Sequence, residues 1–279
     1  MKKSLTLIFC ATLITALASA AVDIAPFGVS ADMQFRSAYQ SRMRVSEDRP
    51  VAVMDVRVYA DVGPAGKIGL MNWSRSSFTD RKSDVHRRAF SEVDYGVYWR
   101  YDLEVADDFT LSSELMHWWI TQPQNIEPHC GKSNRSTYEF WYELAFRNPY
   151  VTPSLFIRRG WINASWVYFR YGAYKPFKVH DFGDAASPKP LVLSPGFFVE
   201  TADNGVFESR FGKKESGRYH TGIGSCIAQV SLKWKASDNL TLHALVQQFG
   251  LVSSDARERV HGNNHRDYTM FRIGMNLSF

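Results

Sequence analysis

Residues 90–103 read Phe-Ser-Glu-Val-Asp-Tyr-Gly-Val-Tyr-Trp-Arg-Tyr-Asp-Leu, and apolar and polar side chains alternate along this stretch. Successive side chains of a β-strand point to opposite faces. One face therefore carries valines and aromatic rings, and the other carries Glu92, Asp94, Gly96, Tyr98, Arg100 and Asp102. The pattern predicts a strand that separates an apolar environment from a polar one.

The same alternation recurs through the chain after residue 21 and predicts twelve strands. It is clear again at residues 138–147 and 271–279. Short turns are expected at 62–66, 106–108, 148–150 and 237–239, and long polar connections at 76–89, 120–136, 202–218 and 251–266. The turn near 177–190 looks long, and the first and fourth connections on the long side look brief. The predicted strands are 31–42, 51–62, 67–75, 90–103, 108–119, 137–147, 152–159, 164–175, 190–201, 219–235, 239–250 and 267–279.

Composition excludes two other classes of protein. Of the 279 residues 45% are apolar, 14% are aromatic and 22% are charged, with a net charge of only +5, which is not the composition of a disordered chain. Mean hydropathy is −0.27, and the one long apolar run is at the N-terminus, which excludes a bundle of membrane helices. The many aromatic residues exceed what a core of this size needs.

The first twenty residues have the pattern of a secretory signal peptide. Lys2 and Lys3 precede an apolar stretch at 5–17, which contains Cys10, and Ala18-Ser19-Ala20 form a small-residue cleavage site. Cleavage there would leave residues 21–279 as one domain. Cys130 and Cys226 would remain, either paired in an oxidising compartment or as two free thiols.

Alternating connection lengths favour a transmembrane antiparallel up-and-down β-barrel, all-β and closed on itself, because lipid offers no partners to a free sheet edge. Twelve strands of about 9–11 residues fit the chain, and ten or fourteen remain open. A β-sandwich would also alternate. Charged residues in mid-strand argue against its dry core. So do aromatic residues near strand ends, where an interfacial girdle is expected: Trp73, Trp99, Tyr101, Phe109, Trp118, Trp119, Phe146, Trp166, Trp234 and Tyr268.

The final residues, 268–279, read Tyr-Thr-Met-Phe-Arg-Ile-Gly-Met-Asn-Leu-Ser-Phe. This segment resembles the terminal strand of Gram-negative outer-membrane barrels, and in size and layout the chain is similar to small porin-like and nucleoside-channel-like barrels of twelve strands. The resemblance implies a place in the bacterial outer membrane and recognition of Phe279 by the barrel assembly machinery. It supplies no substrate-binding motif.

The polar faces of the predicted strands would point inward, so the sequence predicts a lumen lined with charged residues. Acidic residues on strands four to six would form an arc that faces basic residues on other strands. A narrow charged lumen indicates a passive channel for small hydrophilic solutes. The alternative is a set of salt bridges that brace a non-conducting barrel with an adhesion or structural role. Tyr98, Trp141, Tyr174 and Phe198 would narrow the bore. The predicted lumen-lining residues are Arg36, Asp55, Arg57, Glu92, Asp94, Arg100, Asp102, Glu114, Glu139, Glu143, Arg158, Arg170 and Arg272.

Two long connections are basic. Residues 75–89 hold Arg75, Arg81, Lys82, Arg87 and Arg88, and residues 210–218 hold Arg210, Lys213, Lys214 and Arg218. Such loops suit the phosphates of lipopolysaccharide beside the outer-membrane lipid. Capture of an anionic solute or adhesion to an acidic surface is the minor alternative. Without its signal peptide the chain would carry a net charge of +3, which does not predict binding to nucleic acid.

Enzymatic and metal-binding patterns are weak. His129 and Ser133 resemble a hydrolase pair only in composition, because they are four residues apart rather than the two that would put both on one strand face. Pro128 and Gly131 indicate a loop here. His261 and His265 have no acid or cysteine cluster to complete a metal site. His117 and His243 are interpreted as structural. We therefore expect no enzyme, no metal and no cofactor.

Overall fold

The computed structural model describes residues 27–78, 92–121, 136–160, 166–214, 217–219, 222–260 and 266–279. The predicted signal peptide, residues 1–20, lies outside this part of the chain. Among the described residues, no helix combines the length and the apolar character needed to cross a membrane.

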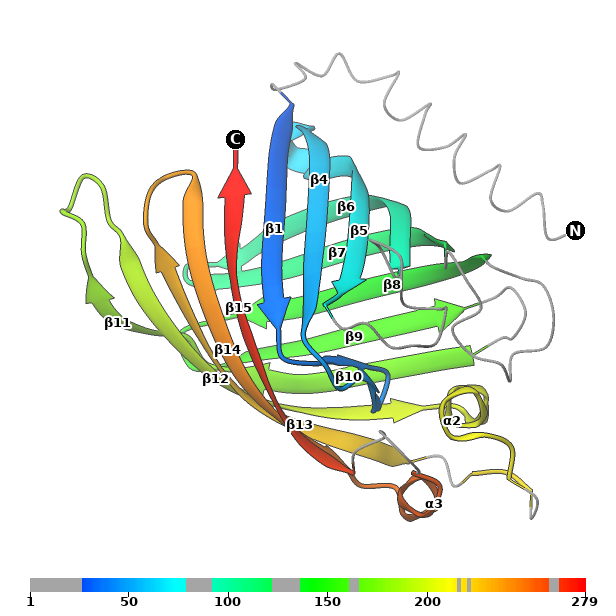
Figure 1. Ribbon diagram of the computed structural model, residues 1–279. Coiled ribbons are helices and arrows are strands. Elements are labelled where there is room, and N and C mark those ends of the chain that lie inside the picture. The colour runs from blue at the N-terminus through cyan, green and yellow to red at the C-terminus, as the bar shows by residue number, and fades with distance from the viewer. Residues whose placement is uncertain are drawn as a thin grey trace, which may run out of the picture.

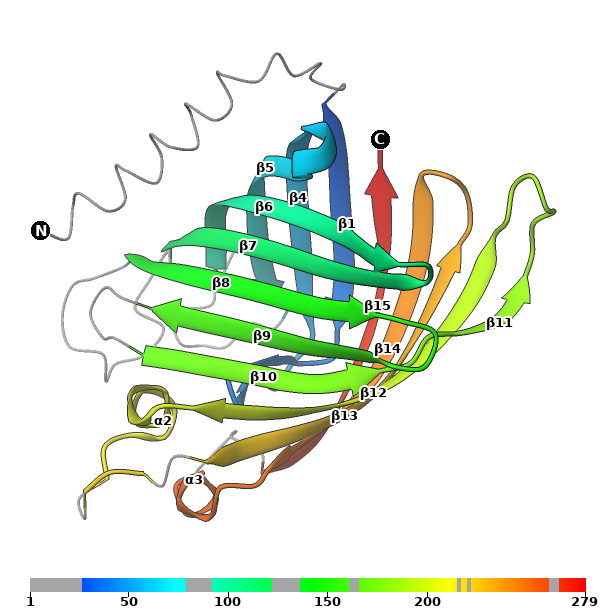
Figure 2. The same cartoon turned by 180° about the vertical axis from the view of Figure 1, so that it is seen from behind.

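Twelve antiparallel strands form a closed barrel (Figures 1 and 2). Each strand pairs with the next along the ring. The ring closes where β1 pairs with β15 and β10 pairs with β12. The predicted fold class and strand number are confirmed. The strands are β1 (Gly28–Arg36), β4 (Val51–Asp61), β5 (Lys67–Ser77), β6 (Glu92–Ala106), β7 (Phe109–Thr121), β8 (Ser136–Arg147), β9 (Thr152–Gly160), β10 (Trp166–Tyr174), β12 (Pro190–Ala202), β13 (Ile223–Lys235), β14 (Leu240–Leu251) and β15 (Asp267–Ser278).

The two ends of the barrel differ in their connections. At the turn end, β4 and β5 are joined through the short helix η1 (Gly63–Ala65). The N-terminal end of β1 and the C-terminal end of β15 lie at the same end of the barrel (Figure 1). One turn-end connection is long, as predicted, and forms β11 (Phe177–Asp181), which extends the pairing with β12. The loop end carries the helices α2 (Asn204–Phe211) and α3 (Ser254–Glu258).

The outer face of the barrel exposes apolar side chains on most of its strands. Leu70, Phe197 and Ile273, from β5, β12 and β15, are 65%, 53% and 60% exposed. Such a surface would be unfavourable in water, and a closed sheet leaves no backbone group unpaired in lipid. The protein is therefore a β-barrel of the kind that spans the bacterial outer membrane.

Part of the predicted aromatic girdle is wrong. Trp73, Trp118, Trp166 and Tyr268 lie on the inner face, and Trp118 is only 2% exposed. Neighbouring residues of a strand must point to opposite faces, so Trp118 and Trp119 cannot both reach lipid. The other predicted girdle residues alternate onto the outer face, where the ring centroids of Phe109 and Phe146 are 5.8 Å apart.

The first predicted strand, 31–42, is also too long. β1 ends at Arg36, and the chain turns back as a hairpin of β2 (Tyr39–Ser41) and β3 (Arg44–Glu47). The first connection is therefore long rather than brief. Alternation continues past Arg36, but Arg42 and Met43 have φ angles of 50° and 63° and reverse the chain. Hairpin turns of this kind usually carry Asn or Gly, so the local sequence gives no signal for it.

Candidate functional site

The connection from β1 to β4, residues 37–50, folds into the barrel, and we call it the inner hairpin. In Figures 1 and 2 it lies between the wall of β1 and β15 and the wall of β9 and β10. The ring of Tyr39 is 5.7 Å from that of Trp73 on β5, and Nε2 of Gln40 donates to Glu200 on β12 at 3.2 Å. The inner hairpin thus crosses the bore near the loop end and contacts opposite walls.

An apolar cluster seats one side of the inner hairpin. Ala38, Met43 and Val45 are buried against α2 and the inner faces of strands β10 to β15. Gly224 of β13 permits this approach, because a Cβ atom there would lie 2.0 Å from Sδ of Met43. The loop-end half of the bore is therefore dry on this side.

A buried carboxylate holds the tip of the inner hairpin on the other side. Glu139 of β8 is 2% exposed and accepts hydrogen bonds from Arg158 of β9 and, at 2.8 Å, from Nε1 of Trp141. Nη1 of Arg42 lies 3.4 Å from the same carboxylate. One anion thus joins two guanidinium groups, and we call Arg42, Glu139 and Arg158 the Glu139 latch.

Aromatic rings complete the surroundings of the Glu139 latch. The guanidinium of Arg158 lies 4.1 Å from the ring centroid of Trp141, and that of Arg42 lies 4.7 Å from the ring of Trp166. Such cation–π contacts favour a guanidinium that has lost part of its water. They therefore help to stabilise the two guanidinium groups that share the carboxylate of Glu139.

A second buried carboxylate, Glu200 of β12, is 1% exposed. It accepts hydrogen bonds from the hydroxyl groups of Tyr168 and Ser225 and from the amide of Gln40. The three donors come from β10, β13 and the inner hairpin. Both carboxylates therefore tie the inner hairpin to the barrel wall.

The backbone at the turn of the inner hairpin adopts an unfavourable conformation, which the contacts with the barrel wall maintain. Non-glycine residues in the left-handed region cost about 1–3 kcal/mol each and persist only where the surroundings fix them. Arg42 and Met43 both adopt this conformation, and the side chain of each is held by the barrel. Tertiary contacts, and not local preference, therefore set the position of the turn.

The thirteen charged residues predicted for the lumen all alternate with the exposed apolar residues of their strands. Like charges meet across neighbouring strands, since Arg36 is directly opposite Arg272 and Glu114 is opposite Glu143. Such pairs are unfavourable unless other charges or water compensate. The full set is Arg36, Asp55, Arg57, Glu92, Asp94, Arg100, Asp102, Glu114, Glu139, Glu143, Arg158, Arg170 and Arg272.

Ion pairs neutralise much of this acidic arc. Nη1 of Arg57 on β4 lies 2.7 Å from Glu114 on β7, and its Nε lies 3.1 Å from Asp55. Since β4 and β7 are not neighbours, the Arg57–Glu114 pair crosses the interior. Another pair joins Glu92 to Arg75 at 3.3 Å. These contacts resemble the bracing that the alternative prediction described.

Toward the turn end the inner face remains open to water. Arg100 and Asp102 form a loose pair at 3.4 Å, with side chains 39% and 41% exposed. Glu143 and Arg147 of β8 and Lys233 of β13 are exposed as well. The interior therefore combines a dry loop-end half with a wet, charged turn-end half.

Sequence reasoning missed the residues that fix the inner hairpin. Tyr39, Gln40 and Arg42 fall within a stretch that alternates like a spanning strand, and Glu200 looks like any inward acid. His243, interpreted as structural, lies 2.9 Å from Asp32 of β1 across two strand interfaces. Only long-range pairing brings these groups together.

Several predicted features lie outside the described residues, including His129, Ser133, His261 and His265. The part of the chain that the structure describes contains no group of three or more His, Cys, Asp or Glu side chains placed to hold a metal ion. Cys226 lies on the outer face of β13, and Cys130 is not described. The possible pairing of these two cysteines stays open.

No family model and no curated protein matches the chain. Among solved structures it is similar to an outer-membrane channel from Pseudomonas putida F1, with 10% identity, a TM-score of 0.50, and coverage of 94% of this chain and 97% of that chain. For the NanC porin these values are 11%, 0.49, 89% and 98%. For the KdgM porin they are 11%, 0.43, 90% and 99%. The likeness to the first of these structures agrees with the barrel fold described above.

Proposed function

We propose that the protein is a passive outer-membrane channel for small hydrophilic solutes with a narrow charged lumen. The observation that carries the proposal is the wet turn-end half of the interior, where Arg100, Asp102 and Glu143 are exposed inside a closed barrel. In a barrel whose interior was filled by salt bridges, we would expect these charged groups to be paired and buried.

The inner hairpin would set the size limit of this channel. Barrels of eight strands are filled by side chains, whereas sixteen leave a broad aqueous pore. With twelve strands and a hairpin fixed to both walls, the narrowest point would lie near the loop end. Only small solutes would then pass between the inner hairpin and the wall.

Charge on the lumen wall would give the channel an ion preference. The acidic pair of Glu114 and Glu143 and the basic pair of Arg36 and Arg272 lie on different walls. Charges of opposite sign across a narrow lumen orient dipolar solutes. Arg57 reduces this field, because it neutralises part of the acidic pair.

The second candidate is a non-conducting barrel with an adhesion or envelope-structural role. It is favoured by the inner hairpin itself, which contacts opposite walls and buries Met43 and Val45. If no water path passes beside the inner hairpin, the turn-end half is a vestibule and not a pore.

The proposal also covers how the chain reaches the membrane and what surrounds it there. Residues 1–20 would be removed after Ala20, and the assembly machinery would recognise the C-terminal strand with Phe279. Basic side chains at the loop end would lie beside lipopolysaccharide phosphates. Passive permeation requires neither a cofactor nor a catalytic group.

Conductance of the purified barrel in a planar bilayer tests the proposal. We expect discrete steps, with cation preference reduced in Glu143→Gln and raised in Arg272→Gln, by about two- to fivefold in permeability ratio. Asp238→Asn, in the turn between β13 and β14, is the control and should leave the ratio unchanged. A silent bilayer with protein whose folding is verified by heat-modifiable gel mobility would support the non-conducting alternative.

A further inference from the structure

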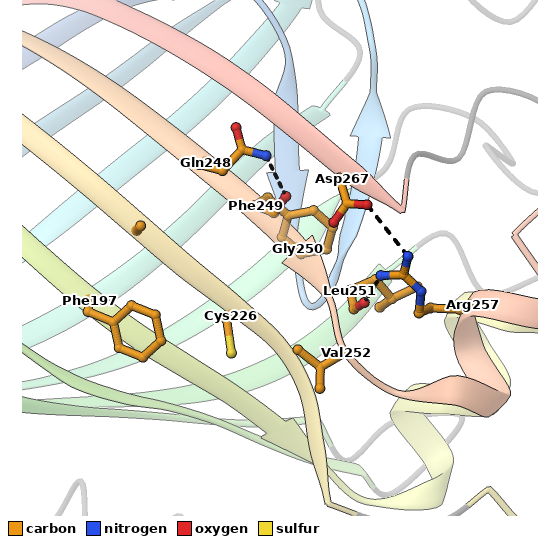
Figure 3. A pocket seen from close by; sticks show the side chains of 10 residues that line it. Phe197, Cys226, Gln248, Phe249, Gly250, Leu251, Val252, Arg257 and Asp267 are labelled. Atoms are coloured by element: carbon orange, nitrogen blue, oxygen red, sulfur yellow. Dashed lines mark hydrogen bonds and ion pairs between the residues drawn. The ribbon is translucent and has the colours of Figure 1, made fainter.

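A groove of about 540 Å³ lies on the outer face of the barrel at its loop end (Figure 3). Strands β12, β13 and β14 form its floor, and the chain that runs from β14 to α3 borders it at the loop end. Its lining includes Phe197, Cys226, Ala228, Gly250, Val252 and Arg257. Because this face of the barrel is the lipid-facing one, the groove opens toward hydrocarbon.

Small side chains on neighbouring strands create the hollow. Cys226 is directly opposite Gly250, and Ala228 is opposite Phe197. A Cβ atom on Gly250 would come within 4 Å of only one atom outside its neighbours, Oδ1 of Asp267 at 3.3 Å. With Phe197 and Val252 exposed beside it, the result is a mostly apolar slot, which Gln248 and the carboxylate of Asp267 border.

A guanidinium group stands at the edge of the groove. Nη1 of Arg257 donates to the carbonyl oxygen of Leu251 at 2.6 Å, and its Nη2 lies 3.6 Å from Asp267. Figure 3 shows this side chain beside Leu251, with the apolar slot on the other side. The backbone contact fixes the group in place, while 39% of the side chain stays exposed.

The loop end around Arg257 is basic. Lys214 pairs with Asp255 at 2.9 Å, and Arg259 donates to the carbonyl oxygen of Lys213, so the two helical connections are tied together. The described residues of these connections and the start of β15 carry Arg210, Lys213, Lys214, Arg218, Arg257, Arg259 and Arg266 against Asp203, Glu208, Asp255, Glu258 and Asp267. An anionic headgroup above the groove would meet an excess of positive charge.

We propose that this groove binds one acyl chain of lipopolysaccharide, whose phosphate lies against Arg257. The inference rests on the proposed outer-membrane location, in which the loop end faces the outer leaflet. An acyl chain gains from the apolar slot, and a phosphate gains charge-assisted hydrogen bonds from a fixed guanidinium. The acyl chain and the phosphate of one lipid molecule would thus bind to neighbouring parts of the same surface.

The thiol of Cys226 offers a direct measure of occupancy. In a Cys130→Ser background it is the one cysteine within residues 21–279. We expect purified rough-type lipopolysaccharide to slow its alkylation by a maleimide in detergent about tenfold, the effect of one good contact. Lipopolysaccharide without phosphates, or phosphatidylcholine, should protect much less. Absent protection, or equal protection by all three lipids, overturns the proposal.

Variants test the groove without relying on the thiol. Gly250→Leu should fill the slot and reduce the lipopolysaccharide that copurifies, as counted by mass spectrometry. Ala244→Leu is the matched control, because it adds a larger side chain to the same face of the same strand away from the groove. Arg257→Gln should lose lipid, and Arg257→Lys should keep most of it. Unchanged lipid in Gly250→Leu would contradict the assignment.

Failure here can be told apart from failure of the channel proposal. The groove lies outside the barrel, so Gly250→Leu should conduct like the wild type. Normal conductance without lipid protection overturns only the lipid site. A barrel that binds lipopolysaccharide yet never conducts overturns only the channel.

Discussion

The two halves of the interior are built from similar residue types and behave in opposite ways. At the loop end, Glu139 and Glu200 are almost fully buried, and each of them contacts the inner hairpin as well as the barrel wall. At the turn end, Glu143 and Arg147 of the same strand as Glu139 remain exposed. An inward carboxylate therefore anchors the structure where another segment covers it, and stays in contact with water where none does.

The largest effect should come from the Glu139 latch. Glu139→Gln would remove the carboxylate that both Arg42 and Arg158 contact, and breaking a buried pair of this kind costs about 3–5 kcal/mol. A urea titration of the folded barrel, followed by gel mobility, would measure this loss. Glu143→Gln, four residues along on the same face, should change stability by less than about 0.5 kcal/mol. Equal effects would erase the distinction between the halves.

The next effect concerns the seat of the inner hairpin. Gly224→Val would place a side chain where Met43 lies, and overpacking of this kind costs about 1–3 kcal/mol. If the displaced hairpin is the constriction, single-channel conductance should rise. Gly222→Val is the control, because a Cβ atom there would have no neighbour within 4 Å. Lower conductance in Gly224→Val would argue against the inner hairpin as the narrowest point.

Arg57 lies between the two halves of the interior, and we expect its substitution to have an intermediate effect on stability. Arg57→Gln removes the cross-barrel pair and leaves Glu114 beside Glu143 without its cation. We expect a loss of about 1–2 kcal/mol and a stronger cation preference, since the partners are partly buried. Reversal potentials under a salt gradient would report the preference. Unchanged selectivity would mean that ions do not pass this wall.

The smallest effect is expected in the wet half. Arg100→Gln breaks an exposed pair at 3.4 Å, and exposed pairs contribute about 0–1 kcal/mol. Denaturant unfolding should barely change, and high salt should remove any difference. A large loss of stability would show that the turn-end half is braced in the same way as the loop-end half.

Local sequence determined the barrel because its strands depend on alternation, a property of neighbouring residues. Residues 92–103 lie in β6 and residues 268–278 lie in β15, and apart from Tyr268 their faces are as expected. The strand limits deviate where the pattern is ambiguous, as at residues 37–42. There, extension and a folded-back hairpin have the same alternation.

Only the tertiary structure decided what the inward residues do. Trp118 and Trp166 are of the residue type that forms a lipid-facing girdle, yet both pack inside the barrel, because their positions along the strands place them on the inner face. Arg42 meets Glu139, far away in sequence, through a turn that no local preference favours. Alternation fixes which side of the sheet a residue takes, whereas burial, pairing and charge compensation depend on segments brought together by closure of the ring.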